Sequence, residues 1–197
     1  MENLYGLVVC GGQSTRMGTD KSLLKYHDIA QRYYVYQMLE GFCDKVFISC
    51  NTDQAIEIDE FYNLIIDKPP YVNIGPMAAL LSANLMYPDA SFLVLGCEYP
   101  FITQNDLKKL IESRETETEA ICFYNPETQF EEPLLAIYEN RCLVKLHHYF
   151  KEGNYSVRHF LKTIKTKRIT PSSFNSITSV DTIKQYKEAL LKLKDKS

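Results

Sequence analysis

The sequence predicts an α/β fold, a three-layer α/β/α sandwich built on a mostly parallel sheet. Short apolar runs rich in Val, Ile, Leu and Phe alternate along the chain with longer stretches of helix-like spacing. The runs are apolar on both faces, which is typical of a parallel sheet that helices cover on its two sides. Because crossovers between parallel strands are right-handed, the alternation favours a doubly wound sheet.

The apolar runs define the expected strands. Five of them cover residues 4–10, 45–50, 63–66, 92–95 and 120–123, and a further strand in the second half of the chain covers residues 133–138. Between them lie the stretches with helical spacing, so the chain repeats a strand-then-helix pattern.

Three helices are predicted with defined ends. Residues 76–86 show the spacing of a core-facing helix, and residues 105–114 form a helix with Thr103 or Asn105 as its N-cap. The last helix covers about residues 181–194, and the charged tail from residue 192 is expected to fray. The apolar side chains expected on one face of this last helix are Ile183, Tyr186, Leu190 and Leu193.

Length and composition limit the possible classes of protein. With 197 residues and 45% hydrophobic content, residues 1–197 are expected to form a single domain with one core. A formal net charge of -3 makes nucleic acid an unexpected partner. Six cysteines without a C-x-x-C pair support neither zinc nor a disulfide framework. The early first strand leaves no room for a signal segment, and no apolar run approaches ~18 residues, so we expect a cytoplasmic protein with no membrane segment.

The stretch that follows the first strand carries the strongest functional signal. It reads Val-Cys-Gly-Gly-Gln-Ser-Thr-Arg-Met-Gly-Thr-Asp-Lys over residues 9–21. Its glycines let the backbone turn sharply, so that successive amides can point at phosphate oxygens. Ser14 and Thr15 add hydroxyl donors. Arg16 and Lys21 add two positive charges, which would stabilise a departing pyrophosphate.

Other interpretations of this stretch are weaker. A glycine-rich turn with two solvated cations would rarely concentrate Gly, Ser, Thr, Arg and Lys together. The Walker pattern needs four residues between its glycines and a Lys directly after the second one, whereas Gly12 and Gly18 enclose five residues. The dinucleotide fingerprint needs G-x-G-x-x-G, and here Gly11 and Gly12 are adjacent.

This stretch resembles the nucleotidyltransferase signature L-A-G-G-x-S-x-R-M-G-x-D-K in the form found in molybdenum cofactor guanylyltransferases. Val9 and Cys10 stand where that family usually has Leu and Ala. The adjacent Gly11 and Gly12 favour guanine over the cytidylyl-transferring relatives. The resemblance covers residues 4 to about 190, and it implies a Rossmann-like fold similar to nucleotide-diphospho-sugar transferases. It also implies that Val9, Cys10, Gly11, Gly12, Ser14 and Lys21 contact the nucleotide.

Three later positions extend the implied nucleotide site. Asn51 follows the second strand, where the resembled family has an Asn that contacts the nucleoside, although an Asn at a strand end is commonly a turn residue. Asp67 could accept hydrogen bonds from the guanine N–H groups. Gly75 and Pro76 begin a helix whose N-terminus would face the nucleotide. Without the other motifs, a plain helix start and a loop carboxylate explain the last two features equally well.

The resemblance also implies a magnesium ion. In the family motif C-D-x-P-F an Asp holds Mg²⁺, and Glu98 stands in its place in Cys97-Glu98-Tyr99-Pro100-Phe101. A carboxylate still suits Mg²⁺, but the extra methylene shifts the oxygens by ~1.5 Å if the backbone is unchanged. We expect Glu98 to act together with Arg16 and Lys21 in catalysis.

Acceptor positions depart further from the family. Glu132 replaces the usual His or Arg in a motif similar to H-P-L-x-A-L-Y. Ser176 and Thr178 occupy the two Asn positions of the closing signature F-x-N-x-N-T-P-E and could still hydrogen-bond a pterin or phosphate. His147 and His148 are expected to be solvated on a helix surface. The basic run 162–168 is interpreted as a solvated face or, alternatively, as a contact for acceptor phosphates.

The reaction implied by the resemblance is the transfer of GMP from Mg²⁺-bound GTP to the phosphate of molybdopterin or molybdenum cofactor, with release of pyrophosphate. Transient contact with cofactor-assembly or acceptor enzymes is implied as well. Two alternatives stay open at this stage. One is a related transferase that uses CTP or another phosphorylated acceptor. The other, motivated by Glu98, Ser176 and Thr178, is a nucleotide-binding homologue with little catalysis.

Overall fold

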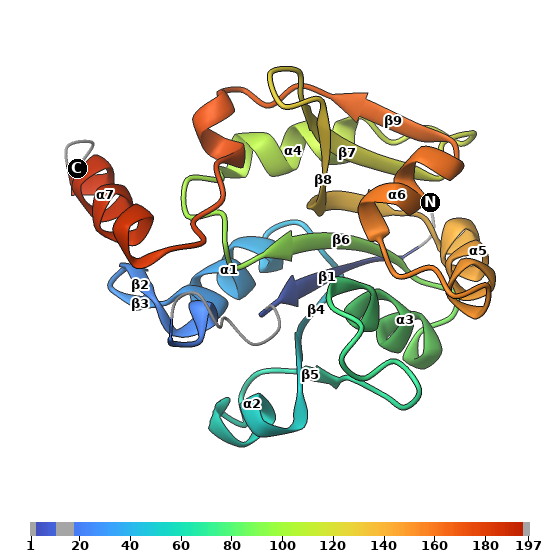
Figure 1. Ribbon diagram of the computed structural model, residues 1–197, viewed down its shortest axis with the longest axis horizontal. Coiled ribbons are helices and arrows are strands. Elements are labelled where there is room, and N and C mark those ends of the chain that lie inside the picture. The colour runs from blue at the N-terminus through green and yellow to red at the C-terminus, as the bar shows by residue number, and fades with distance from the viewer. Residues whose placement is uncertain (1–2, 11–17, 195–197) are drawn as a thin grey trace.

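The structure, a computed structural model, describes residues 3–10 and 18–194. A seven-stranded sheet in the order β5-β4-β1-β6-β8-β7-β9 forms its centre (Figure 1). Strands β5, β4, β1 and β6 are parallel, whereas β8 is antiparallel to both of its neighbours. The strands are β1 (Leu4–Val9), β4 (Lys45–Cys50), β5 (Leu64–Ile66), β6 (Ser91–Gly96), β7 (Ala120–Asn125), β8 (Phe130–Tyr138) and β9 (Thr166–Ile169).

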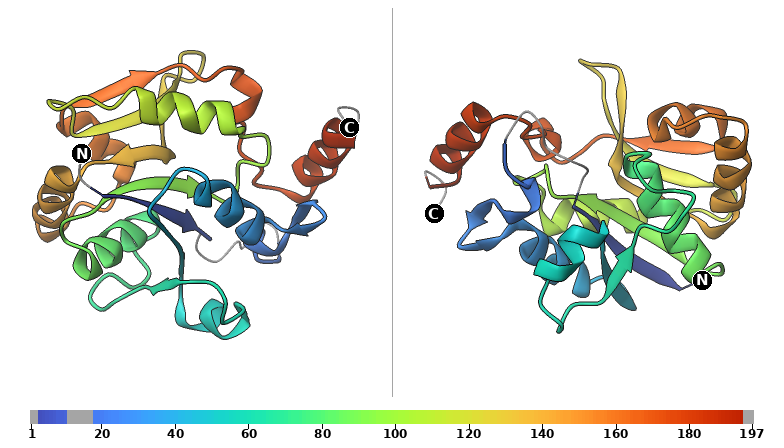
Figure 2. Two further views of the ribbon diagram at one scale, coloured as in Figure 1. Left: turned by 180° about the vertical axis from the view of Figure 1, so that it is seen from behind. Right: turned by 60° about the horizontal axis from the view of Figure 1, so that its bottom comes forward.

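Helices cover both faces of this sheet. When the molecule is seen from behind, α1 and α4 lie in front of the sheet, and α3, α5 and α6 lie on the opposite face (Figure 2). The α-helices are α1 (Gln31–Glu40), α2 (Thr52–Glu57), α3 (Pro76–Met86), α4 (Gln104–Glu112), α5 (Asn140–Lys151), α6 (Val157–Thr163) and α7 (Ile183–Lys194). The predicted three-layer, mostly parallel α/β architecture is therefore confirmed.

The innermost strands are apolar and buried on both faces. Every residue of β1 and β6 is buried, which explains why their sequences are continuous apolar runs. Gly6 lets helix α1 pack closely on β1, because a Cβ at this position would lie 3.1 Å from Cβ of Leu39.

Several predicted ends agree with the structure and others need correction. Helix α3 has the predicted bounds, and α4 is capped by Thr103, whose hydroxyl accepts from the amide of Asp106. Asn105 is therefore a residue of the first turn and not the N-cap. Helix α7 begins at Ile183, whose side chain is half exposed, while Tyr186, Leu190 and Leu193 of the predicted apolar face pack against a small core cluster. Ala189 occupies the buried position of that helix.

Helix α7 packs on a small hairpin that the sequence analysis did not predict. The hairpin consists of β2 (Lys25–His27) and β3 (Ile29–Ala30), and it follows the 3-10 helix η1 (Lys21–Leu23). The rings of Tyr26 and Tyr186 meet edge to face with centroids 5.1 Å apart. Figure 1 shows this hairpin and α7 beside the end of the sheet toward which β1 and β6 point. The contact therefore closes one side of the region that follows these strands.

The basic run 162–168 is engaged by acidic side chains. Its last three residues, 166–168, lie in the edge strand β9, which is parallel to β7. Arg168 and Lys162 contact the buried Glu131 at 2.9 Å and 3.8 Å, and Lys165 and Lys167 pair with glutamates in the turn before β7. Charged side chains on an edge strand, here Lys167 and Arg168, also discourage pairing with a second sheet. The side chains of all four cations stay at least 33% exposed, so the run forms a solvated face with ion pairs, as predicted. Its contact with acceptor phosphates stays a prediction.

A buried ion pair joins the turn after helix α4 to the residue that follows β8. The guanidinium of Arg114 donates two hydrogen bonds of 2.8 Å to the carboxylate of Glu139, which also accepts a 2.7 Å bond from Ser91. We expect Arg114→Ala to lower the free energy of unfolding by roughly 3 kcal/mol, because it leaves a buried carboxylate without its cation. Urea unfolding measures the loss. Lys184→Ala, which breaks an exposed ion pair, is the control and should lower the free energy of unfolding by about 0.5 kcal/mol or less. A loss that small in Arg114→Ala would contradict the prediction.

No helix in the described ranges is long and apolar enough to cross a membrane.

Candidate active site

The carboxyl ends of three adjacent parallel strands lie level at one edge of the sheet. Val9 of β1 is in register with Ser49 of β4 on one side and with Gly96 of β6 on the other. The amide of Cys10 donates to the carbonyl of Ser49, and the amide of Cys97 donates to the carbonyl of Val9. The segments that leave these strands therefore start side by side, at the edge where open α/β sheets bind ligands. The predictions for Gly11, Gly12, Ser14 and Arg16 lie outside the described residues.

A cleft of about 430 Å³ opens at this edge between β1, the start of α2, the end of β5 and the start of α3. It brings together four residues predicted from the sequence as nucleotide contacts, namely Val9, Asn51, Asp67 and Gly75. Polar and apolar side chains share its walls. The residues that line it are Val9, Ser49, Cys50, Asn51, Thr52, Asp53, Gln54, Asp67, Val72, Asn73, Gly75, Pro76 and Ala79.

Asp67 supplies a carboxylate to the wall of the cleft. It directly follows β5, and its amide donates a 3.0 Å hydrogen bond to the carbonyl of Cys50, which continues the pairing of β4 and β5. Burial raises the pKa of this carboxyl to about 6. The group is therefore mostly ionised at neutral pH, in surroundings where an added hydrogen-bond donor would stabilise its charge.

The N-terminus of helix α3 forms another part of the wall. Gly75 is its N-cap with a φ of 69°, a conformation that side-chain-bearing residues rarely adopt, and Pro76 begins the first turn. The helix runs for eleven residues, so the positive end of its dipole faces the cleft and favours negative charge on a ligand.

Asn51 has a structural role in addition to lining the cleft. Its Oδ1 accepts a 2.8 Å hydrogen bond from the amide of Gln54, and the Gln54 side chain accepts one from the amide of Asn51, so the two form a capping box for α2. Asn51 therefore has the structural role that the sequence analysis gave as the alternative to nucleotide contact. The NH₂ end of Asn51 is the part of the side chain that remains for a ligand, and its contact with a nucleoside stays a prediction.

Helix α2 is linked to the segment that carries Lys21. The side-chain amide of Gln54 donates a 2.7 Å hydrogen bond to Oδ2 of Asp20, whose Oδ1 accepts from the amide of Ser22. Asp20 thereby caps η1 and fixes the start of the segment. These bonds join the cleft to the cation at Lys21 through a short series of side chains.

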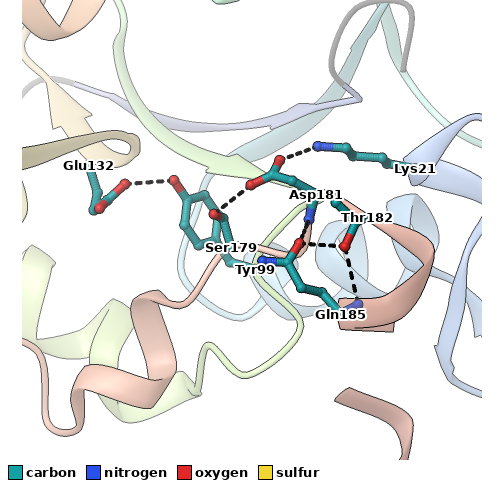
Figure 3. A network of polar contacts seen from close by, with 7 residues as sticks. All are labelled: Lys21, Tyr99, Glu132, Ser179, Asp181, Thr182 and Gln185. Carbon is teal, nitrogen blue, oxygen red and sulfur yellow. Dashed lines mark hydrogen bonds and ion pairs between the residues drawn. The ribbon is translucent and has the colours of Figure 1, made fainter. Parts of the chain in front are cut away.

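Lys21 points toward the segment that enters helix α7. Its ammonium group forms an ion pair with Asp181, whose other carboxylate oxygen accepts a 2.8 Å hydrogen bond from the hydroxyl of Ser179 (Figure 3). The amide of Asp181 donates to Gln185 of α7. Asp181 was not predicted as a site residue. The sequence feature that could have indicated it is its position: Asp181 is the last residue of the closing signature, where the resembled family has an acidic residue.

Glu98 belongs to the same charged cluster. Its carbonyl accepts a 2.8 Å hydrogen bond from the amide of Val180, which holds the segment before α7 against the end of β6. Burial raises the pKa of the Glu98 carboxyl to about 7, the positive charge of Lys21 opposes the rise, and the negative charge of Asp181 adds to it. A partly buried carboxylate with a raised pKa is stabilised by any cation that binds beside it.

The side chains present suit a magnesium ion bound together with a substrate. Within residues 3–10 and 18–194, no group of three or more His, Cys, Asp or Glu side chains forms a metal cage. Mg²⁺ is commonly held by one or two carboxylates with phosphate and water oxygens, and it needs no such cage. Glu98 and Asp181 provide two carboxylates close enough to perturb each other. The donor set therefore fits Mg²⁺.

A further carboxylate, that of Glu132, is held by the residue after Glu98. The hydroxyl of the buried Tyr99 donates a 2.9 Å hydrogen bond to Glu132 of β8 (Figure 3). Strand β8 has an irregular register at this point, because Cys122 pairs with Ala136 and the next residue of β7 pairs with Glu132. Such a bulge turns a side chain toward a site, and burial raises the pKa of the Glu132 carboxyl.

Ser176 and Thr178 lie in and directly after the 3-10 helix η2 (Phe174–Ile177). Ser176 is buried and its side chain contacts the carboxylate of Asp106, whereas Thr178 is exposed and its hydroxyl donates to the carbonyl of Phe174. Their part in acceptor binding stays a prediction. His147, expected on the surface, instead lies half-buried between Tyr71 and α3, whereas His148 is exposed as predicted.

A sheet edge that combines a cleft of about 430 Å³ with a lysine and clustered carboxylates has the features that a nucleotidyltransferase needs. Residues 6–169 match the family model described as MobA-like NTP transferase domain, and the chain belongs to this family. The enzyme class predicted from the glycine-rich stretch is thus confirmed.

Individual relatives agree with this family. The chain is 24% identical over 197 residues to a probable molybdenum cofactor guanylyltransferase of Bacillus mycoides, covering 96% of each chain. It is 33% identical over 137 residues to a molybdenum cofactor biosynthesis bifunctional protein of Synechocystis, with 68% of this chain matched but only 39% of the length of that protein. The crystal structure of molybdopterin-guanine dinucleotide biosynthesis protein A from Archaeoglobus fulgidus has the same fold, with a TM-score of 0.80, 19% identity and coverage of 97% and 99%.

Proposed function

We propose that this chain transfers GMP from GTP to the phosphate of molybdopterin or molybdenum cofactor, releasing pyrophosphate and forming a guanine dinucleotide. One observation carries the proposal. The cleft that holds Asp67 is linked through Gln54 and Asp20 to the cluster of Lys21, Asp181 and Glu98. A base and its phosphates can therefore occupy one continuous edge of the sheet. The names of the curated relatives support this donor and acceptor.

Asp67 is the residue that selects guanine in this proposal. Guanine presents two adjacent N–H donors on one edge, and an ionised carboxylate can accept from both. Cytosine presents only one donor group on its corresponding edge. Because the Asp67 carboxylate is partly desolvated, it gains more from two donors than from one.

The chemical step needs no protein nucleophile. An oxygen of the acceptor phosphate attacks the α-phosphorus of GTP, the bond from that phosphorus to the bridging oxygen breaks, and pyrophosphate leaves with the electron pair. Lys21, held in place by Asp181, stabilises the negative charge on the transferred and leaving phosphates. Arg16 is proposed as a second cation. Glu98 and Asp181 would hold Mg²⁺, which supplies positive charge to the phosphate oxygens when it is bound.

The pH dependence of GTP binding tests the role of Asp67. Because the pKa of its carboxyl is about 6, the accepting, ionised form is present above pH 6 and is lost as the pH falls. Affinity for GTP should therefore fall by about tenfold per pH unit below pH 6. Calorimetric titrations between pH 5 and 8 measure this. Asp67→Asn should bind GTP weakly over the whole pH range, and its affinity should depend less on pH below pH 6. If the dependence of affinity on pH is the same in Asp67→Asn as in the wild type, the assignment is contradicted.

The reaction itself is tested by pyrophosphate release with each of the four nucleoside triphosphates in the presence of molybdopterin and Mg²⁺. We expect release that depends on both GTP and molybdopterin, and a product that carries one GMP. A preference for CTP would overturn the guanine assignment. Tight GTP binding without turnover would instead favour a nucleotide-binding homologue with little catalysis.

A further inference from the structure

The loop 67–75 forms one wall of the cleft, and it contacts helix α5 on its outer side. Val72, Asn73 and Gly75 line the cleft. Asn73 and Gly75 both have positive φ angles, of 63° and 69°, and Val72 is 43% exposed. The part of the loop that faces a ligand is thus poorly packed. Its position depends on how the preceding residues are held.

Two hydrogen bonds hold this loop from outside the cleft. The amide of Lys68 donates to the hydroxyl of Ser82 in α3 at 3.0 Å. The hydroxyl of Tyr71 lies 3.1 Å from Nδ1 of His147 in α5, and Nε2 of His147 lies 3.0 Å from Oδ1 of Asn84 in α3. His147 therefore joins the loop to both helices that pack on this side of the sheet.

The direction of each hydrogen bond in this series follows from Asn84. Its Nδ2 donates to the carbonyl of Pro88, so its Oδ1 is the end that accepts from Nε2–H of His147. Nδ1 of a neutral His147 then carries no proton and accepts from the hydroxyl of Tyr71. Burial, with Lys151 and His148 nearby, lowers the pKa of His147, so the ring is neutral at pH 7. Each polar atom of the series has one defined partner.

Aromatic packing adds to the hydrogen bond. The ring of Tyr71 meets Phe150 edge to face at a centroid distance of 5.2 Å, and Phe150 meets Tyr155 in the same way at 5.7 Å. Because these contacts do not involve the Tyr71 hydroxyl, Tyr71→Phe removes the hydrogen bond and keeps the packing. This makes the two contributions separable.

We propose that His147 is a positioning residue for the nucleotide cleft, which it supports through Tyr71 and the loop 67–75. The proposal rests on the proposed function, since it takes the cleft to be the site of the nucleoside. His147 lies on the outer side of the loop and does not line the cleft. It therefore acts on affinity by fixing the wall before the nucleotide arrives.

The experiment compares Tyr71→Phe, His147→Ala, the double variant and the control His148→Ala, whose exposed ring neighbours His147 in sequence. KM and Kd for GTP should rise about fivefold in Tyr71→Phe, as expected for one lost hydrogen bond. They should rise at least as much in His147→Ala, which also loses the hydrogen bond to Asn84, and kcat should change less than twofold in both variants. The double variant should be no weaker than the weaker single variant, because both remove the same interaction. His148→Ala should match the wild type.

A merely structural role would lower the melting temperature and leave KM unchanged, and that result, or fully additive effects, would overturn the proposal. Hydrogen exchange of the amides at residues 71–75 in the nucleotide-free protein gives an independent readout, which should become faster in both single variants. If another nucleoside triphosphate binds more tightly than GTP, the guanine assignment fails. The role proposed for His147 then still predicts a fivefold rise in the Kd of that nucleotide in Tyr71→Phe.

Discussion

Replacing Lys21 by methionine should lower kcat for nucleotidyl transfer by roughly 10³-fold, which is the usual cost of removing a charge aimed at a transition state. Methionine keeps the length and most of the apolar stem of lysine but cannot neutralise the departing pyrophosphate. The Lys21 side chain is 19% exposed, and its partner Asp181 is 42% exposed, so loss of their ion pair should cost little stability. Single-turnover rates with saturating GTP measure the chemical step separately from binding.

A matched control for this variant is Lys25→Met, because Lys25 is an exposed lysine of the adjacent hairpin. It should retain transfer within about twofold. If Lys21→Met also keeps a rate close to that of the wild type, the cation at the end of this segment has no role in the reaction.

The second large effect is expected at Glu98. Glu98→Gln keeps the shape of the side chain and removes the charge that would hold Mg²⁺, so transfer should fall by 10²- to 10³-fold. The stability of the Glu98→Gln protein should increase, although its transfer rate falls. The pKa of this carboxyl is about 7 in the folded protein against 4.5 for the ordinary group, so ionisation destabilises the fold as the pH rises from 4.5 to 7. The neutral variant should therefore melt at a higher temperature than the wild type at pH 8 and at the same temperature below pH 4.5.

Two further variants sharpen this test. Glu98→Asp restores the acid of the resembled motif and should keep measurable transfer. Glu127→Gln, in the exposed turn between β7 and β8, should change neither the rate nor the melting temperature. A Glu98→Gln protein with the wild-type rate would remove Glu98 from the catalytic group.

The sequence predicted the sheet well because the central strands are buried on both faces. Strands β1, β4 and β6 are short and mostly apolar, and such runs spaced by helix-length segments favour parallel strands covered by helices. The polar strands were missed for the opposite reason. Strand β9 (Thr166–Ile169) is an edge strand with charged side chains, and the β2–β3 hairpin is stabilised by contact with α7, which is far away in the sequence.

The candidate site could be predicted where its residues directly follow a strand. Asn51, Asp67 and Glu98 come after β4, β5 and β6, so their common location follows from parallel topology. Contacts between distant segments could not be predicted in this way. Lys21 and Asp181 are 160 residues apart in the chain. The packing of α7 on the hairpin and the hydrogen bond from Val180 to Glu98 bring them together. The hydrogen bonds of His147 likewise depend on how α3 and α5 lie against each other.

The central claim is that the guanine base lies in the cleft beside Asp67 while the phosphates lie beside Lys21 and Glu98. A crystal structure with Mg²⁺ and a GTP analogue whose α,β-bridging oxygen is replaced by methylene tests it most directly, because transfer cannot occur. We expect the guanine N–H edge on the Asp67 carboxylate, the β-phosphate on the Lys21 ammonium and a metal ion on Glu98. A nucleotide bound elsewhere, or phosphates directed away from Lys21 and Glu98, would contradict the account.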